Sequence, residues 1–424
     1  MTTASMDAGK SAEQLYAERA KRLQDAAELR QPDRIPVMLG MGYKLAELGG
    51  ITRKQLHDDP ELAHQLLEQA ALTFQPDTIM GVLGGPEPSR ILGDRMTRWP
   101  GYGLDDNGSF QFVEHEFMKA DEYDAFLDDM SDWAIRVYLP RAFEKLEGFS
   151  LLPPLGTALE GYAGLFSIGA LTAPPIAAGL QALLQAAEAN ARAAEPGMRS
   201  MQRLAALGFP PVPFFGVFCS APFDFMSDTL RGMRGIMLDM LRQPDKLLAA
   251  EEKVARMHLK KAYNQAAALG TKYIGFMLHR GSDGFMSLAQ FERFYWPQLK
   301  AMFLDLIDHG LTPFVFYEGV WDQRLHYLAE LPRGKTVGMF QSSNIFKVKE
   351  IVGDTMCIIG GMPNSLLKGG TVTQVREYTH KLCEVVGKGG GYIMTTAVGE
   401  LEGCQPELIK AWIDATREFG VYDA

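Results

Sequence analysis

Eight short apolar segments recur along this chain of 424 residues, and glycine-rich or polar turns followed by amphipathic helices separate the last five. The segments are Ile35–Leu39, Thr78–Leu83, Val212–Phe218, Tyr273–His279, Pro313–Gly319, Thr336–Gln341, Cys357–Met362 and Tyr392–Thr396. Eight strands that alternate with helices predict an α/β fold, a (β/α)8 barrel of the TIM type. In such a barrel the functional side chains lie at the C-terminal ends of the strands. The chemistry is therefore expected in the windows that follow these segments.

The alternation of strands and helices is interrupted after the second strand, between about residues 85 and 205. Arg98–Met118 alternates around Asp105–Gly108, and the Asn-Gly pair in this turn is typical of a β-hairpin. Alanine-rich helical segments follow as far as Gly208. We therefore predict a single domain over residues 1–424 with a hairpin-plus-helix insertion that covers the barrel mouth. Whether the insertion serves as a lid or as the surface of a homodimer stays open.

Composition excludes several classes of protein. The net charge of −10 argues against nucleic acid or an anionic membrane surface as a partner. Four cysteines without a CxxC pair argue against a disulfide framework. The N-terminus has no apolar signal core, and Pro174 and Pro175 interrupt the most apolar run, Gly161–Leu184. These features predict a cytoplasmic protein that acts on a small molecule.

Two neighbouring strand ends carry the residues best suited to catalysis. The fourth strand closes on His279 and Arg280, and Glu318 stands at the end of the fifth. Imidazole serves as a base, a hydrogen-bond donor or a metal ligand, and a carboxylate in an apolar strand end is costly unless it is paired or functional. We expect both side chains to face one cavity. Asp283 would orient them or lie near the N-terminus of the next helix.

A second set of residues past the strand ends is predicted to contact substrate. The set is Tyr43, Lys44, Phe223, Phe225, Met226, Tyr317, Trp321, Asn344 and Met362. Their aromatic character favours a flat, apolar ligand, and Lys44 and Arg280 are the cations available for an anion. Core packing is the alternative for the aromatic residues, and helix capping is the alternative for Asn344. The glycine-rich stretch Gly387–Gly391 precedes a strand, which predicts a helix-to-strand turn and not a phosphate cradle.

Several stretches resemble the uroporphyrinogen decarboxylase superfamily, which includes zinc- and corrinoid-linked methyltransferases. The matching stretches are Arg34–Val37, Phe74–Asp77, Met286–Phe291 with Trp296–Pro297, Gly360–Met362, Gly390–Ile393, Gln405–Glu407 and Arg417–Gly420. The resemblance covers most of the chain and is strongest after residue 270. It implies a barrel fold, in agreement with the strand pattern.

The family's catalytic residues are absent. The decarboxylases follow strand one with an arginine-rich stretch, where this chain has Met38–Tyr43. Their aspartate after strand two falls on Gly84 here, and their histidine near the last strand falls on Val398. The thiol-activating methyltransferases carry His-x-Cys where this chain has Phe316–Glu318, and a cysteine at Val398. We therefore do not expect porphyrinogen decarboxylation.

Glu318 stands at the position where the thiol-activating methyltransferases carry the cysteine of the His-x-Cys motif. With His279 it makes a ligand pair that suits Zn²⁺. A third ligand would be Asp283, Glu400 or Glu402. The resemblance then implies a methyltransferase that demethylates a small aromatic or apolar substrate. No Asp-x-His-x-x-Gly corrinoid signature occurs in the chain, so a separate corrinoid protein would accept the methyl group. A cofactor-free decarboxylase or lyase acting on an aromatic acid, and a catalytically silent binding barrel, are the two alternatives.

Overall fold

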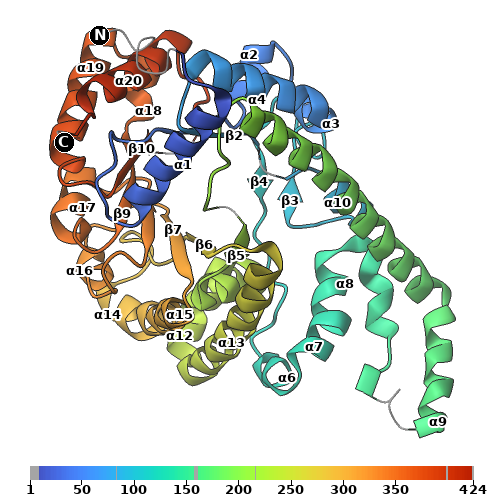
Figure 1. Cartoon of the computed structure of the whole chain (residues 1–424). Helices are drawn as coiled ribbons and strands as arrows, with labels where there is room; N and C mark the ends of the chain where they lie inside the picture. The colour runs from blue at the N-terminus through green and yellow to red at the C-terminus, as the bar shows by residue number, and fades with distance from the viewer. Residues whose placement is uncertain (1–8, 83, 157–160, 215, 398–399, 423–424) are drawn as a thin grey trace.

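Eight parallel strands form the centre of the molecule (Figure 1). The structure is a computed structural model that describes residues 9–422, apart from 83, 157–160, 215 and 398–399. The central strands are β1 (Met38–Gly40), β2 (Thr78–Met80), β5 (Val217–Cys219), β6 (Tyr273–Leu278), β7 (Thr312–Tyr317), β8 (Val337–Phe340), β9 (Cys357–Met362) and β10 (Tyr392–Thr396). Each overlaps a predicted segment, and β9 and β10 match theirs residue for residue.

The strand order is that of a (β/α)8 barrel. Strands β10-β9-β8-β7-β6-β5 form one sheet, β1 pairs with β2, and a parallel bridge between Val37 and Met394 joins β1 to β10. At the remaining seam, between β2 and β5, the Thr78 hydroxyl donates to the Pro210 carbonyl at 2.8 Å. The predicted fold class is confirmed.

Helices surround the strands and close one end of the barrel. The long ones are α1 (Ala12–Ala27), α4 (Pro60–Phe74), α12 (Gly232–Arg242), α13 (Pro244–Leu269), α15 (Trp296–Asp308), α19 (Val372–Lys381) and α20 (Pro406–Phe419), with the shorter α17 (Ile345–Val352). Leu23 and Ala26 of α1 pack with Phe214, Phe314 and Ile393. This cluster fills the end of the barrel at which the strands begin.

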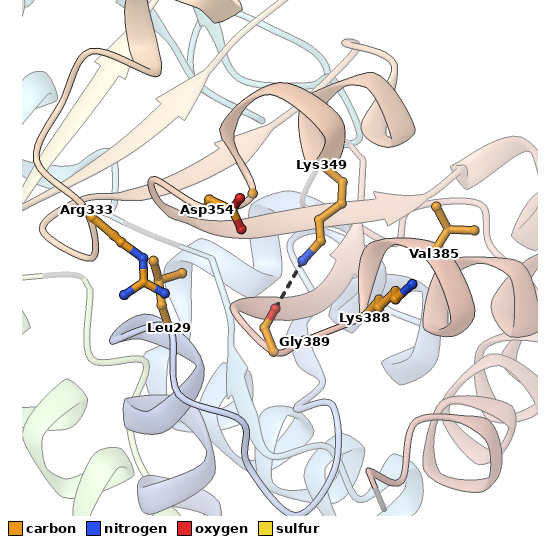
Figure 2. A pocket seen from close by; sticks show the side chains of 9 residues that line it. Leu29, Arg333, Lys349, Asp354, Val385, Lys388 and Gly389 are labelled. Carbon is orange, nitrogen blue, oxygen red and sulfur yellow. Dashed lines mark hydrogen bonds between the residues drawn. The ribbon is translucent and has the colours of Figure 1, made fainter.

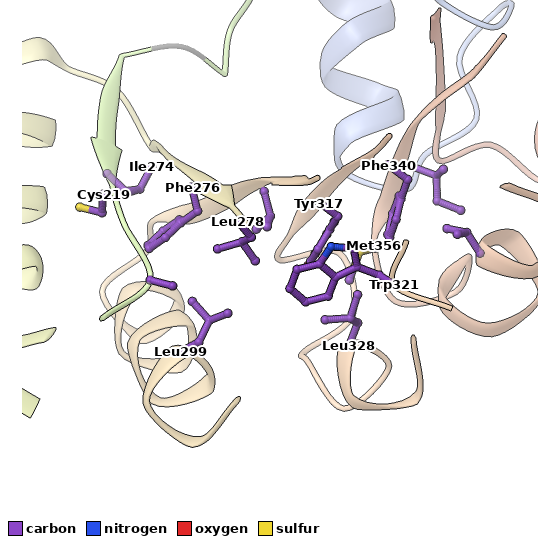
Figure 3. Packing of buried hydrophobic residues seen from close by; sticks show 14 of the residues in the cluster. Cys219, Ile274, Phe276, Leu278, Leu299, Tyr317, Trp321, Leu328, Phe340 and Met356 are labelled. Atoms are coloured by element: carbon purple, nitrogen blue, oxygen red, sulfur yellow. The ribbon is translucent and has the colours of Figure 1, made fainter. Parts of the chain in front are cut away.

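Side chains along each strand alternate between the barrel interior and the helical layer. On β6 and β7, Tyr273 and Phe314 belong to the interior cluster. Phe276 and Leu278 pack outward beside Leu299 of α15, as Figure 3 shows. This alternation decides which residues can reach the barrel mouth.

The predicted insertion lies between β2 and β5. Strands β3 (Thr97–Arg98) and β4 (Gln111–Phe112) form the expected antiparallel hairpin. Helices α5 (Glu87–Leu92), α6 (Tyr123–Asp128), α7 (Met130–Trp133) and α8 (Leu139–Ala142) and the 33-residue α10 (Pro174–Ala206) complete the segment. Helix α10 contacts α4 and α5, and Figure 1 shows its first half projecting away from the barrel with α9 (Gly161–Gly164) at its far end. Within the described ranges, none of the helices combines the length and apolar character that a membrane span requires.

A buried ion cluster ties the first two strands together at their N-terminal ends. Asp77 precedes β2 and accepts hydrogen bonds from Arg34 at 2.7 and 2.9 Å and from the Val37 amide at 2.8 Å. Arg22 of α1 joins the same carboxylate. Burial acts to raise the pKa of Asp77, but the two arginines outweigh it and hold the pKa well below its usual value. Arg34 and Asp77 lie in the two N-terminal stretches that carry the family resemblance.

We expect Asp77→Asn to lower the free energy of unfolding by about 3–5 kcal/mol, because it leaves the buried Arg34 guanidinium without a carboxylate and leaves Arg22 with Asp33 alone. Urea unfolding measures the loss. Asp124→Asn is the matched control, since Asp124 pairs with Lys246 at the surface and such pairs contribute about 1 kcal/mol or less. Equal stability of the two variants would contradict the assigned role.

Candidate functional site

His279 and Glu318 lie side by side at the C-terminal ends of β6 and β7. Leu278 is in register with Tyr317, so the next residue of each strand faces the barrel interior at the same level. The His279 Nε2 and Glu318 Oε2 atoms are 3.3 Å apart. Their side chains are 40% and 46% exposed, so both are accessible from solvent. The predicted juxtaposition is confirmed.

Two aspartates from the segment after β5 fix the imidazole. Asp228 lies in the π-helical turn η6 (Phe225–Arg231), and its Oδ2 is 2.8 Å from His279 Nδ1. Asp224, in the short helix α11 (Pro222–Asp224), accepts the backbone N–H groups of His279 and Arg280, both at 3.0 Å. The Tyr295 hydroxyl donates to Asp224 at 2.8 Å. These bonds orient the ring so that Nε2 faces Glu318.

The carboxylates set the charge of His279. Burial acts to lower the pKa of this imidazole, but the hydrogen bond to Asp228 and the charges of Asp224, Asp228 and Glu318 together raise it to about 9. His279 is therefore an imidazolium at neutral pH. Burial and the charge of Asp228 raise the pKa of Asp224 to about 6, against the opposing effect of His279. The site thus holds a proton donor among acidic groups.

Both predicted anion-binding cations are already paired. Arg280 binds Asp228 Oδ1 at 2.8 Å and Glu114 Oε2 at 2.9 Å. Lys44 is buried and its Nζ is 2.6 Å from Glu47 Oε2. Carboxylates therefore outnumber the cations around His279, an arrangement that disfavours a polyanionic ligand.

The segment from the β3–β4 hairpin to Met118 lies beside the C-terminal ends of strands on two sides of the barrel. Trp99 lies beside Gly84, because a Cβ built on Gly84 would be 3.7 Å from its ring. The Trp99 ring also contacts the ring of His57, and His57 Nε2 is 3.0 Å from the Tyr43 hydroxyl. After the hairpin, Glu114 contacts Arg280 and accepts the Met233 amide at 2.6 Å. The insertion thus reaches the barrel mouth next to both β1 and β6.

Most of the predicted aromatic pocket belongs to the core. Five of its residues are at most 1% exposed in the main apolar cluster: Phe223, Met226, Tyr317, Trp321 and Met362. Tyr317 illustrates the reason, because it precedes the inward-facing Glu318 and so points to the helical layer, where it stacks on Phe340 with centroids 4.7 Å apart. Phe225 is partly buried against His258. The placement of these residues in a substrate pocket is corrected.

The inward-facing side chains below the site were overlooked in the sequence: Met277 and Phe316 lie one inward position below His279 and Glu318, and Phe218 is level with Gly275, one position further down. Phe218, Met277 and Phe316 occupy the interior positions of β5, β6 and β7, and each is partly exposed. Gly275 allows the Phe218 ring to approach, because a Cβ there would lie 2.7 Å from it. These three residues form the apolar surface beneath His279 and Glu318.

The remaining predicted residues have structural roles. Asn344 caps α17 by accepting the amides of Phe346 and Lys347, at 3.1 and 3.3 Å. Asp283 accepts the Gln323 amide at 3.0 Å and lies 3.5 Å from Arg324. It therefore braces the loop after β7 and does not cap the next helix, whose N-cap is Ser287.

The donor set for zinc is incomplete. The proposed third ligands are engaged elsewhere: Glu402 pairs with Arg53, Glu400 lies against Gly42, and Asp283 binds the loop after β7. Among the described residues no group of three His, Cys, Asp or Glu side chains is placed to hold a metal. Catalytic zinc sites use three protein ligands. The residues here do not fit such a site.

Asp224, Asp228 and Glu114 were missed in the sequence. Asp224 and Asp228 stand four residues apart in the window after the third predicted segment, which is the spacing of a helix face. The aromatic residues of this window favoured a substrate pocket, so the two aspartates were not assigned to the site. Glu114 lies in the insertion, and no local pattern links it to β6.

The acidic site around His279 lies at the C-terminal ends of the strands of a (β/α)8 barrel, which is where such barrels carry their functional sites. The family model described as uroporphyrinogen decarboxylase (URO-D) matches residues 168–419. The chain belongs to this family. A methyltransferase from Methanosarcina mazei has a similar fold, with a TM-score of 0.57 and 15% sequence identity over 95% of this chain and 98% of that one. A comparison with curated protein sequences gives no match.

We expect an NMR titration of His279 to give a pKa of about 9, and Asp228→Asn to lower it by removing the hydrogen bond at Nδ1. Because the folded pKa lies above the ordinary value of about 6.5, protonation of His279 stabilises the fold. This contribution is complete below about pH 6.5 and is lost as the pH rises through 9.

The exposed histidine His309, next to Asp305, is the control, and Asp305→Asn should leave the titration of His279 unchanged. A His279 titration near pH 6.5 in the unmodified protein would contradict the assigned electrostatics.

Proposed function

We propose that this protein is a one-carbon transferase that removes a methyl group from a small, neutral aromatic or apolar methylated compound. In this proposal a separate corrinoid protein supplies the methyl acceptor. His279 is the proton donor, and Glu318 is its partner at Nε2. Phe218, Met277 and Phe316 provide the apolar surface for the substrate.

In the proposed reaction the bond between the methyl carbon and its oxygen breaks. The methyl group passes to the acceptor nucleophile, and the electron pair of the broken bond stays on the oxygen. His279 Nε2 transfers its proton to that oxygen, so the product leaves as a neutral alcohol or phenol. General acid catalysis and stabilisation of the developing negative charge lower the barrier.

The observation that carries the proposal is the orientation of His279. Asp228 holds Nδ1 at 2.8 Å, and Nε2 faces Glu318 at 3.3 Å in a solvent-accessible position. The excess of carboxylates favours a neutral substrate. Membership of a family whose fold is shared with a methyltransferase supports the reaction class.

A decarboxylase or lyase is the second candidate, and the family match favours it. The same imidazolium would then protonate the carbanion left by the departing CO₂. That reaction needs a cation for the substrate carboxylate, and Arg280 and Lys44 are both paired. Methyl transfer therefore agrees better with the charges at the site.

We expect His279→Asn to slow demethylation of aryl methyl ethers by about 100-fold or more in the presence of a reduced corrinoid acceptor. Glu318→Gln should have a smaller effect, because it keeps the shape of the side chain. Formation of the free phenol, followed by chromatography, measures the rate. His309→Asn is the matched control for loss of a histidine.

An unchanged rate in His279→Asn would overturn the assignment of the proton donor. Release of CO₂ from aromatic acids without any demethylation would favour the second candidate. Metal analysis of the same preparations tests the zinc hypothesis. Stoichiometric zinc in the unmodified protein, lost in Glu318→Gln, would reinstate the zinc site.

Uroporphyrinogen should not be decarboxylated by the purified protein. The stretch Met38–Tyr43, which comprises β1 and the turn after it, supplies no arginine, and Arg280 and Lys44 are neutralised by their own partners. Several carboxylates would thus enter the site without positive partners. Incubation under anaerobic conditions, with chromatography of the porphyrins after oxidation, checks this. Stepwise loss of carboxylates would refute our placement of the strand ends.

A further inference from the structure

Figure 2 shows a cavity of about 370 Å³. It lies at the end of the barrel opposite His279, because its lining residues come from the segments before β1, β8, β9 and β10. Its charged residues come from three segments: Arg333 precedes β8, Lys349 and Asp354 come from α17 and the turn that follows it, and Lys388 precedes β10. All four lie where the strands begin, whereas His279 lies where they end. The volume is within the range of small-molecule sites.

The cavity carries an excess of positive charge in a chain whose net charge is −10. Three cations face one carboxylate, that of Asp354. In the part of the chain that the structure describes, Arg333 and Lys388 form no ion pair. Lys349 donates to the Gly390 carbonyl at 3.3 Å, and burial lowers its pKa against the opposing effect of Asp354. An anion would restore the balance of charge.

The glycine-rich turn supplies one wall of this cavity. It lies between η8 (Leu382–Val386) and β10, as the sequence predicted, and Gly389 and Gly390 have φ angles of +78° and +87°. A Cβ on Gly389 would meet no atom within 4 Å, so the turn borders open space. Recognition here would come from side chains around the turn and not from a helix N-terminus.

We propose that this cavity binds a small phosphate-bearing anion. Three cations that line one cavity match a ligand that carries two negative charges and several acceptor oxygens. The planar guanidinium of Arg333 suits a phosphate group because it can donate two parallel hydrogen bonds. Leu29 and Val385 flank the cations and offer an apolar surface for the remainder of the ligand. A polycarboxylate also carries several negative charges, so the test separates phosphate from carboxylate ligands.

Isothermal titration calorimetry at fixed ionic strength, with inorganic phosphate and pyrophosphate as probes and citrate as the carboxylate arm, tests the proposal. We expect phosphate and pyrophosphate to bind more tightly than citrate. Lys349→Met and Arg333→Met should each weaken the binding about tenfold or more, since each removes a charged hydrogen-bond donor. Arg333 is exposed, so its substitution keeps the test valid if Lys349→Met fails to fold.

Lys335→Met is the matched control, because Lys335 is exposed two residues from Arg333 and does not line the cavity. Its affinity for phosphate should equal that of the unmodified protein. Equal weakening in all three variants would reveal general electrostatic attraction and overturn the proposal. Absence of phosphate and pyrophosphate binding, or tighter binding of citrate, would overturn it as well.

Discussion

In a ring of parallel strands, consecutive side chains alternate between the interior and the helical layer, and the register between strands decides which interior residues are neighbours. The site of this protein depends on that constraint. Because Leu278 is level with Tyr317, His279 and Glu318 meet without any long-range adjustment. A shift of one residue in either strand would turn one of them into the helical layer and separate the pair.

Most of the charged groups that act on His279 come from outside these two strands. Asp224 and Asp228 enter from the turn after β5, and Glu114 enters from the insertion. Asp224 holds the backbone at the end of β6, and Asp228 holds the ring itself. In the proposed reaction these two aspartates position His279, and its Nε2 atom and Glu318 are the groups that face the substrate.

Sequence patterns predicted the strands well because an apolar run bounded by glycine and polar turns depends only on residues close together in the chain. They also identified His279 and Glu318, whose proximity follows from strand order. They misplaced Tyr317 and Trp321, since an aromatic residue near a strand end has the same appearance whether it faces the mouth or the helices. They missed Glu114, because its contact with Arg280 spans 166 residues and depends on how the insertion folds back.

The parallel bridge between Val37 and Met394 joins the first strand of the barrel to the last. During synthesis β1 and β2 can pair early and gather the Asp77 ion cluster, but the other edge of β1 stays open until nearly the whole chain has left the ribosome. An open edge is a template for unwanted pairing, and long-range pairing slows folding. The nascent N-terminal unit therefore depends on rapid synthesis of β10, or on a chaperone that covers the free edge of β1 until β10 pairs with it.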